Sequence, residues 1–365
     1  MNAMIKPNFD WYTATPGAKT FIVSTADELA GLAEIVNGTW GGKRDNFSGK
    51  TIKLTGDIDL SRYDNWVPIG DYARSTRFFS GVLDGGGHCI SKLSIDRPRK
   101  RCQGLFGHIR HGRVENLGLD SVNISGREYV GAMVAYLGEN SSLINVYSTG
   151  MIHGGGSAIG GLVGLIDTKC IVANCYSTCV VSGRIGVGGL AGIVGGDFGG
   201  ENRVANCYSI GVVSGFTDVG GVVGCIEHDS GITNCYSIGA VCGDRVVGGV
   251  AGRIVDNGYV ANCAALNPDV KGKANCVGRV LGSIYIPKQA VLSNNVAYAG
   301  MSSNADNAKR STNGAEWIDG EDIAMEVIRT DPTIGGRFTE DGGWTIVDGK
   351  LPGLFNRPVD WPEHL

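Results

Sequence analysis

Carboxylates are the side chains in this sequence with the clearest catalytic potential, and five aspartates lie close together in the N-terminal part of the chain. Paired carboxylates hydrolyse glycosidic bonds, and a basic residue beside a carboxylate-bound calcium ion would act on acidic sugars. If a catalytic groove exists, we expect it in this region. Aspartate is also a common turn residue, so turn chemistry is the simpler interpretation. The five residues are Asp57, Asp59, Asp64, Asp71 and Asp84.

The remaining acids and the histidines show no catalytic pattern. The six histidines, His108 and His111 included, form no recognisable triad. We therefore predict no catalytic residue and expect that the chain is not an enzyme, with a polysaccharide lyase or hydrolase as the alternative. The acids between 130 and 260 share no position in a repeat: Glu139, Asp167, Asp197, Glu201, Asp218, Glu227, Asp229, Asp244 and Asp256.

Four tyrosines hold one repeated position and are the predicted ligand-binding residues. Each lies in a phrase of the type Asn-Cys-Tyr-Ser, as at Asn174–Ser177. Strand alternation that turns the cysteine and serine inward turns the tyrosine outward. An outer aromatic strip could stack against sugar rings or a protein partner. Alternatively, the rings stack on one another to cover the sheet, and the opposite parity would bury them. The residues are Tyr147, Tyr176, Tyr208 and Tyr236.

Cysteine is abundant, yet the pattern predicts buried free thiols. The count of eleven is odd, and an in-register ladder is a poor geometry for a disulfide. The chain has no Cys-x-x-Cys pair, and the coil with Cys170, Cys175 and Cys179 lacks a fourth zinc ligand. We predict no metal site and no cofactor. Four cysteines share one repeat position: Cys175, Cys207, Cys235 and Cys263.

These residues belong to a repeat that predicts the fold. Seven asparagines, which we call the marker asparagines, are spaced 29, 29, 32, 28, 28 and 32 residues apart: Asn116, Asn145, Asn174, Asn206, Asn234, Asn262 and Asn294. A second phrase, such as Val187-Gly-Gly-Leu-Ala-Gly192, and a third apolar run, such as 178–183, keep the same period. Glycine and β-branched residues disfavour helix. We predict an all-β, right-handed parallel β-helix with three strands per coil of 28–32 residues.

Both ends carry signals for a short capping helix. Thr25 and Glu28 form a capping box before a helix expected over 26–37, which Gly38 ends. A second helix is expected after Asp319, and a hairpin or strand over 344–352 closes the chain. We therefore divide one continuous domain into an N-terminal segment with a helix and a first coil, a repeat array, and a C-terminal cap. The boundaries are 1–60, 61–300 and 301–365.

Composition narrows the classes of partner. The net charge is −4 and charged residues make up 19% of the chain. The protein therefore has no overall positive charge to attract nucleic acid or an anionic membrane, and we predict neither as a partner. No stretch is long and apolar enough for membrane insertion, and residues 1–10 lack the features of a secretory signal. The basic run 97–101 could hold a sulfate or phosphate, although a solvated loop tip is the simpler interpretation.

The Gly-Gly-Leu-Val-Gly and Asn-Cys-Tyr-Ser phrases resemble the GLUG-motif family of bacterial repeat proteins over residues 104 to 282. The sequence departs from the pattern at Ala132 and Arg279, and Ala264 replaces the repeat tyrosine. The resemblance implies a β-helix in secreted or surface proteins, including adhesins and immunoglobulin A peptidases in which the repeat is not the catalytic part. We therefore predict a non-catalytic, adhesin-like scaffold that binds a glycan or a host or bacterial surface protein. Because no signal peptide is seen, a cytoplasmic location also stays open.

Overall fold

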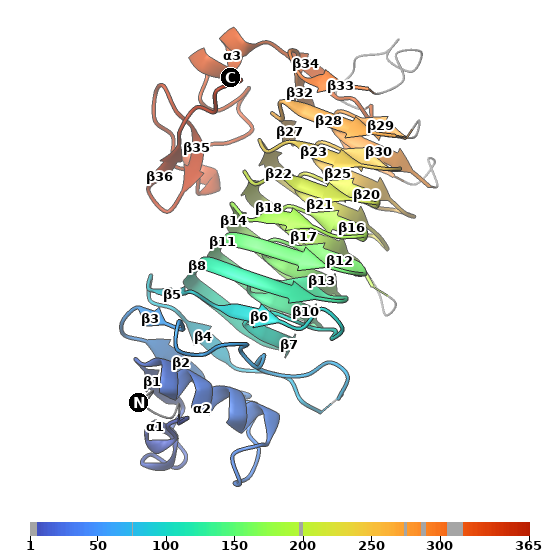
Figure 1. The fold of residues 1–365 in the computed structure, drawn as a ribbon. Coiled ribbons are helices and arrows are strands. Elements are labelled where there is room, and N and C mark those ends of the chain that lie inside the picture. Colours follow the sequence, from blue (N-terminus) through green and yellow to red (C-terminus); the bar gives the residue numbers. More distant parts are fainter. Residues whose placement is uncertain (1–5, 75, 197–199, 274–275, 286–289, 305–316) are drawn as a thin grey trace.

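The computed structural model describes residues 6–74, 76–196, 200–273, 276–285, 290–304 and 317–365. It shows a parallel β-solenoid of about ten turns with few helices, which confirms the predicted fold class. Successive coils stack along one axis, with the N-terminal helices below the first coil (Figure 1). The fold is therefore a long scaffold whose walls are sheets.

Each regular coil contains four short strands where the sequence predicts three extended segments. One coil consists of β14 (Ile171–Ser177), β15 (Val180–Ser182), β16 (Ile185–Gly188) and β17 (Ala191–Val194). The Gly-Gly phrase is divided between β16 and β17. A Cβ on Gly189 would lie 2.2 Å from the carbonyl oxygen of Gly221 in the next coil. The glycine thus allows the chain to turn between two strands at close backbone approach.

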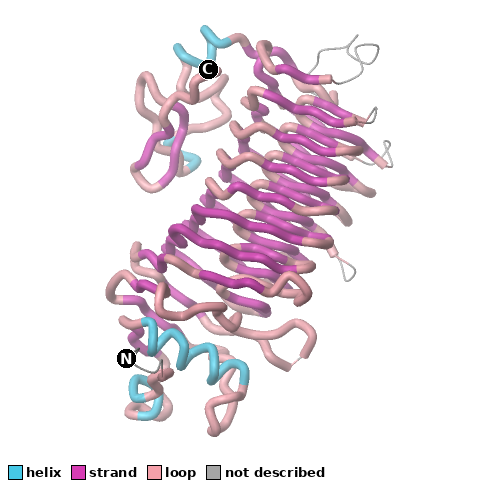
Figure 2. The backbone as a smooth tube through the Cα atoms, viewed as in Figure 1, coloured by secondary structure: helices cyan, strands magenta, loops and turns pink. Residues whose placement is uncertain are grey.

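Equivalent strands pair in parallel register from coil to coil, so that residues of one repeat position form rows (Figure 2). In two of the walls, which are separate parallel sheets, each coil contributes one strand. One holds β7 (Phe106–Arg110), β10 (Val134–Gly138), β13 (Val163–Asp167), β17, β21 (Val223–Ile226), β25 (Ala251–Ile254) and β30 (Leu281–Ile284). The other holds β9 (Val130–Gly131), β12 (Ser157–Gly160), β16, β20 (Thr217–Gly220), β24 (Val247–Gly248) and β29 (Val277–Gly278).

The third and largest sheet extends from β1 to β34 and crosses the boundaries that we expected near 60 and 300. Its strands are β1 (Thr20–Val23), β2 (Thr51–Leu54), β3 (Ile58–Asp59), β4 (Val82–Asp84), β5 (Cys89–Ser91), β6 (Ser94–Asp96), β8 (Arg113–Gly126), β11 (Ser142–Gly154), β14, β15, β18 (Arg203–Ser209), β19 (Val213–Gly215), β22 (Gly231–Ser237), β23 (Val241–Gly243), β26 (Tyr259–Ala261), β27 (Ala264–Ala265), β28 (Asp269–Gly272), β31 (Val291–Ser293), β32 (Val296–Tyr298), β33 (Ser302–Ser303) and β34 (Glu321–Ile323).

The marker asparagines form a corner of each coil. All seven have left-handed backbone conformations, with φ between 51° and 56°. Asparagine tolerates this conformation better than most residues. The side-chain amides bond from coil to coil, as in Asn174 Nδ2 to Asn145 Oδ1 at 3.3 Å and Asn234 Nδ2 to Asn206 Oδ1 at 3.1 Å. The asparagine side chains therefore form an amide ladder along the coils.

The cysteines of the repeat line the interior. Cys175, Cys207 and Cys235 are fully buried and lie in register in β14, β18 and β22. All eleven cysteines are free, as predicted for this ladder. Each Sγ in the row contacts a main-chain carbonyl, at 3.1 Å for Cys207 Sγ and Ala205 O. Burial raises the pKa of the Cys207 thiol, which keeps it protonated.

The N-terminal cap agrees with its sequence signal. Helix α2 (Ala26–Asn37) has the predicted capping box, and Gly38 follows it with φ 70°. Its buried face packs on the first coil. A short helix, α1 (Asp10–Thr13), adds Trp11, whose ring lies 5.5 Å from that of Phe21. This end of the solenoid is therefore closed by aliphatic and aromatic side chains.

The C-terminal segment differs from the expected end cap. The predicted helix begins later, as α3 (Met325–Thr330), because Glu321–Ile323 pairs with β32 as strand β34. After α3 the chain turns back along the side of the coils through a 3₁₀ turn (Glu340–Gly342) and the hairpin β35 (Leu351–Leu354) and β36 (Arg357–Val359) (Figure 1). We call residues 331–365 the C-terminal strap.

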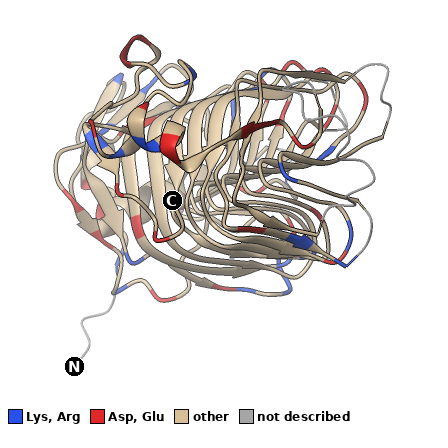
Figure 3. Ribbon diagram, turned by 90° about the horizontal axis from the view of Figure 1, so that it is seen from above, with Lys and Arg blue, Asp and Glu red and all other residues tan. Residues whose placement is uncertain are grey.

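Charged residues lie mostly on loops and at the ends, while the walls of the solenoid carry few (Figure 3). Within the described residues, no helix is long and apolar enough to cross a membrane.

Candidate functional site

The four predicted tyrosines form a ladder on the outside of the coils. Neighbouring rings from Tyr147 to Tyr236 have centroids 4.9, 4.8 and 5.0 Å apart and are nearly parallel. In-register strands place each ring directly over the next. The cysteine that precedes each of the last three rings points inward, so the predicted strand parity is correct.

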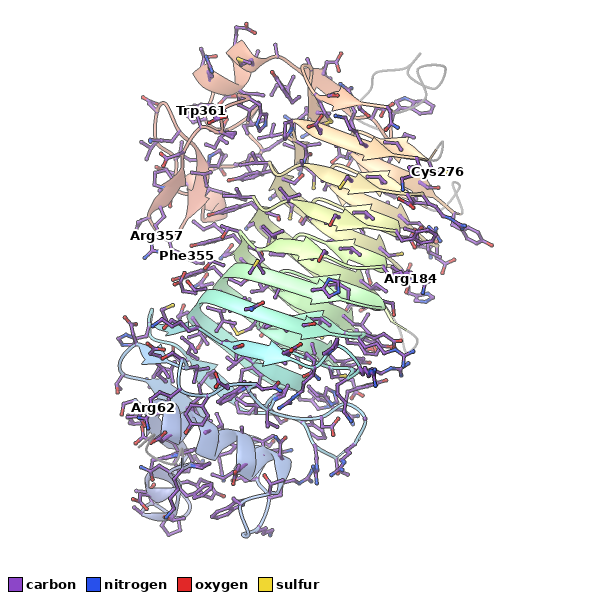
Figure 4. All side chains as sticks on the ribbon, in the orientation of Figure 1. Arg62, Arg184, Cys276, Phe355, Arg357 and Trp361 are labelled. Atoms are coloured by element: carbon purple, nitrogen blue, oxygen red, sulfur yellow. The ribbon has the colours of Figure 1, made fainter. Side chains whose placement is uncertain are left out.

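The tyrosine ladder is not an exposed strip, and that part of the prediction is wrong. The C-terminal strap covers it, so that Tyr176, Tyr208 and Tyr236 are only 6%, 3% and 0% exposed. The covering side chains are Phe338, Trp344 and Phe355. Figure 4 shows Phe355 on the strap, which runs beside the coils. The aromatic surface is large and apolar, and burying it under the chain's own segment removes it from water.

Polar contacts fix the strap on the ladder. Asn206 Nδ2 donates to the carbonyl of Gly342 at 2.8 Å, and the buried Tyr236 hydroxyl donates to the carbonyl of Pro352. His364 Nε2 lies 2.7 Å from the carbonyl oxygen of Leu266. Binding of an external ligand to these tyrosines stays a prediction, and it requires displacement of the strap.

The N-terminal aspartates mostly have turn and ion-pair roles. Asp57 accepts from the main chain of Cys89 at 2.9 Å, and Asp59 pairs with Lys92 at 2.8 Å. The Lys92 hydrogen bond lowers the pKa of Asp59 to about 2. Asp64 lies in a turn and Asp84 accepts from Asn116, which leaves Asp71 beside a cavity. No groove of paired carboxylates is formed by these five residues.

The structure instead brings polar side chains together on the wall made by β7, β10 and β13. A cavity of about 480 Å³ opens there beneath the loop formed by residues 69–74 and 76–79. We call it the histidine cleft. Its lining residues are Tyr72, Ala73, His108, Arg110, Tyr136, Gly138, Glu139 and Asp167.

Parallel register assembles the histidine cleft. His108 and Tyr136 are paired positions of β7 and β10, and Gly138 is paired with both Arg110 and Asp167. Side chains one coil apart are therefore vertical neighbours. Parallel bridges from Ile69 to Phe106 and from Phe79 to Ile109 hold the loop against β7. The loop places the Tyr72 ring on that of Tyr136, with centroids 4.1 Å apart.

The floor of the histidine cleft is buried and its rim is accessible. Asp167 is 2% exposed and accepts hydrogen bonds from the Tyr136 hydroxyl at 2.5 Å and from Thr168 Oγ1 at 2.9 Å. Burial, and then the hydrogen bond to Asp167, raise the pKa of Tyr136 well above its usual value. At the rim, half-exposed Glu139 and Arg110 pair at 2.6 Å. The cleft thus offers both hydrogen-bond acceptors and donors.

Two buried polar atoms of the cleft residues have no partner among the described residues: His108 Nδ1 and Arg110 Nε. Burial, with a smaller effect of the neighbouring Arg110 charge, lowers the pKa of His108 to about 4. The imidazole is therefore neutral at pH 7. Buried polar groups are normally satisfied, so unpartnered groups beside a cavity favour a polar ligand there.

Sequence reasoning considered Asp167, Glu139 and His108 one by one but did not bring them together. Their spacing was the missed signal, because His108 and Tyr136 are separated by one coil, as are Gly138 and Asp167. The contribution of Tyr72 had no such signal, since its loop has no equivalent in the array. Asp197, another acid of the array, lies outside the described residues. Within the described ranges, no group of three or more His, Cys, Asp or Glu side chains could hold a metal ion.

Solved structures share this fold. A provisionally named immunoglobulin A1 protease from Bacteroides ovatus matches with a TM-score of 0.62 and 20% identity, over 93% of both chains. A structure named IgA1 protease matches with a TM-score of 0.52 and 18% identity, over 69% of this chain and 20% of that one. Identities this low show the fold alone.

One curated relative is similar in sequence. Halomucin of Haloquadratum walsbyi is 34% identical over 155 residues, which is 40% of this chain. The chain spans about 2% of the length of that relative. No protein-family model matches the chain, and the resemblance to the GLUG-motif family stays a prediction.

These comparisons correct our expectation that the chain is not an enzyme. Both solved structures carry the name of a protease, in one case provisionally, so the non-catalytic assignment does not stand. The sequence-based argument had rested on scattered acids without a shared position. Glu139 and Asp167 in one cleft remove that reason as well.

Proposed function

We propose that the chain is a surface-associated β-helix module that binds a glycan in the histidine cleft. The halomucin relative supports a surface location. The observation that carries the binding proposal is the combination of aromatic rings and unpartnered polar atoms around one cavity. The rigid solenoid holds these side chains in place before binding, which lowers the entropy lost when a ligand binds.

The chemistry of the cleft matches a sugar. Sugar hydroxyls both donate and accept hydrogen bonds, and the cleft contains the acceptors Glu139 and Asp167 together with the donor Arg110. Neutral His108 adds a nitrogen, Nδ1, that has no hydrogen-bond partner among the described residues. The half-buried Tyr72 ring gives an apolar surface for the C–H face of a sugar ring. A volume of about 480 Å³ lies in the range of small-ligand sites.

A second candidate function is hydrolysis or elimination of a polysaccharide at the same cleft. The observation that favours it is the presence of two carboxylates, Glu139 and Asp167, in one cavity. Glycoside hydrolysis uses such a pair, one as acid and one as base or nucleophile. A reducing-end assay on polygalacturonate and hyaluronate separates this candidate from binding alone.

The first experiment is binding of the intact chain to an array of neutral and acidic glycans. We expect saturable binding that Glu139→Gln weakens about tenfold, because a charge-assisted hydrogen bond is lost without a change of shape. Tyr72→Ala is expected to weaken binding by a similar factor. Glycan binding that is unchanged in both variants would refute the cleft as the site.

Matched controls come from the same chain. Glu201→Gln removes an acid that has a left-handed backbone, like Glu139, and pairs with Lys169 at 3.7 Å outside the cleft. Tyr285→Ala removes a tyrosine that is 72% exposed. Neither change should alter glycan binding, and a loss in either control would indicate a surface other than the cleft.

A further inference from the structure

A second cavity lies at the N-terminal end of the solenoid, between α2, the segment 63–71 and the basic run 97–101. Its volume is about 520 Å³. Asn37, the last residue of α2, holds the segment in place by donating to the carbonyl of Pro68 at 3.0 Å and accepting from the main chain of Gly70 at 2.9 Å. The cavity is therefore part of the fixed packing of the cap. We call it the basic pocket.

One side of the basic pocket is apolar. Ala30 and Ala33 of α2 face it together with Trp66, Val67 and Pro68. Val67 is 57% exposed, although valine is a residue that folding normally buries. A ligand with an apolar ring or chain would cover this surface.

The other side of the basic pocket is positively charged. Four cations and two acids line the cavity: Arg77, Arg97, Lys100 and Arg101, with Glu34 and Asp71. Arg101 is engaged by Glu128 at 2.6 Å, and Arg97 donates to the carbonyl of Asn65 at 2.7 Å. Among the described residues, Arg77 and Lys100 have no acidic partner. The excess of positive charge is complementary to an anion.

Gln103 gives an independent indication of a ligand. It is only 4% exposed and lines the pocket, and its Oε1 has no hydrogen-bond partner among the described residues. Its Nε2 is satisfied by the carbonyl of Arg101 at 2.5 Å, which fixes the orientation of the amide. A buried acceptor without a donor costs free energy that a ligand N–H or O–H would recover.

We propose that the basic pocket binds an amphipathic organic anion. Its apolar ring or chain lies on Ala30, Ala33 and Val67, and its carboxylate or sulfonate lies near Lys100 and Arg77. An N–H or O–H group donates to Gln103 Oε1. This site is separate from the histidine cleft, so a protein that binds no glycan could still bind the anion.

The test uses two dyes that differ in one group. Anilinonaphthalene sulfonate has an aromatic body, an N–H donor and an anionic group, while N-phenylnaphthylamine lacks the sulfonate. We expect one saturable site for the sulfonate dye on the intact chain, at least tenfold tighter than for the neutral dye. Equal affinity for both dyes would overturn the proposal, because it would indicate an apolar surface without an anion site.

Variants locate the dye. Lys100→Glu should weaken binding of the sulfonate dye about tenfold or more, and Gln103→Leu should weaken it by a smaller factor. Lys53→Glu makes the same charge change at an exposed residue that does not line the pocket, and it should leave binding unchanged. Thermal unfolding of each variant checks that it folds. Unchanged affinity in folded Lys100→Glu protein, or an equal loss in Lys53→Glu, would overturn the site. Glu139→Gln, in the histidine cleft, should not alter dye binding.

Discussion

The regular coils and the N-terminal coils are built from the same kind of parallel strand, but they differ in what lies on their outer surface. In the coils from β14 to β22, the repeated asparagine, cysteine and tyrosine each stack on the equivalent residue of the neighbouring coil. Both cavities described above lie instead among residues 7–167, where loops interrupt the repeat. Both cavities form where a segment without an equivalent in the repeat lies against the coils, so departures from the repeat create these two candidate sites.

The C-terminal strap converts the tyrosine ladder, the most regular surface of the coils, from an exposed surface into a buried one. A tyrosine row in isolation would be a large exposed aromatic patch, which soluble proteins rarely leave uncovered. Here the repeat provides the row, and the non-repetitive C-terminal residues cover it. The repeated asparagines, cysteines and tyrosines therefore stabilise the fold, whereas the candidate binding sites lie in the irregular coils.

The largest expected effect on stability comes from removing Trp344, a side chain by which the strap packs on the tyrosine ladder. Trp344 is 3% exposed and its ring lies 5.6 Å from that of Tyr236 and 4.8 Å from that of Phe338. Trp344→Ala should lower the free energy of unfolding by roughly 3–5 kcal/mol, measured by urea denaturation. Trp317→Ala, at a tryptophan that is 54% exposed, should change it little. Equal effects of the two changes would mean that the strap does not stabilise the coils.

The next largest effect concerns the irregular coils and depends on pH. His108 has a pKa near 4 in the folded protein and 6.5 as the ordinary value. Between these values the unfolded chain binds a proton that the folded chain does not. As the pH falls from 6.5 to 4, stability should therefore decrease by on the order of 3 kcal/mol.

His108→Gln should remove this part of the pH dependence, measured by urea denaturation between pH 4 and 7. His153→Gln is the control, because His153 is exposed and its Nδ1 lies 2.9 Å from Ser182 Oγ. An identical pH profile in His108→Gln and the unaltered chain would contradict the buried, neutral imidazole.

A smaller effect sharpens the contrast inside the regular coils. Cys207 is fully buried in the cysteine ladder, whereas Cys242 is exposed on β23. Cys207→Ser should cost about 1–3 kcal/mol of stability, because a hydroxyl is desolvated in an apolar row. Cys242→Ser should be neutral within error in the same denaturation experiment. A neutral result at Cys207 would show that the interior tolerates polar groups.

The smallest expected effect is at the asparagine corner. Asn206 has φ 53° and donates to both Asn174 and the strap. Asn206→Gly keeps the left-handed conformation and loses the hydrogen bonds, at a cost of about 1 kcal/mol. Asn206→Ala should cost about 1 kcal/mol more, since alanine is strained there. Calorimetric melting of both variants separates hydrogen bonding from backbone strain, and equal melting temperatures would argue against strain.

The sequence predicts what is local or periodic and misses what is neither. Thr25, Glu28 and Gly38 set the bounds of α2, because capping depends on neighbouring residues. The period of the asparagines sets the coils and their ladders. The contact of Asn206 with Gly342 joins residues 136 positions apart and has no periodic marker. The same holds for Tyr72 over Tyr136, so the covered ladder and the histidine cleft both require the folded chain.

The strap also has a mechanical consequence. In an ordinary solenoid each coil contacts only its neighbours, so a force applied at one end unravels the coils one after another. Here residues 331–365 span several coils, with contacts from Tyr147 to Tyr298. Tension on the C-terminus would load the strap first and peel it from the aromatic row before any strand pair is pulled. The strap would then act as a sacrificial link, and its aromatic contacts would set the force at which the rod begins to yield.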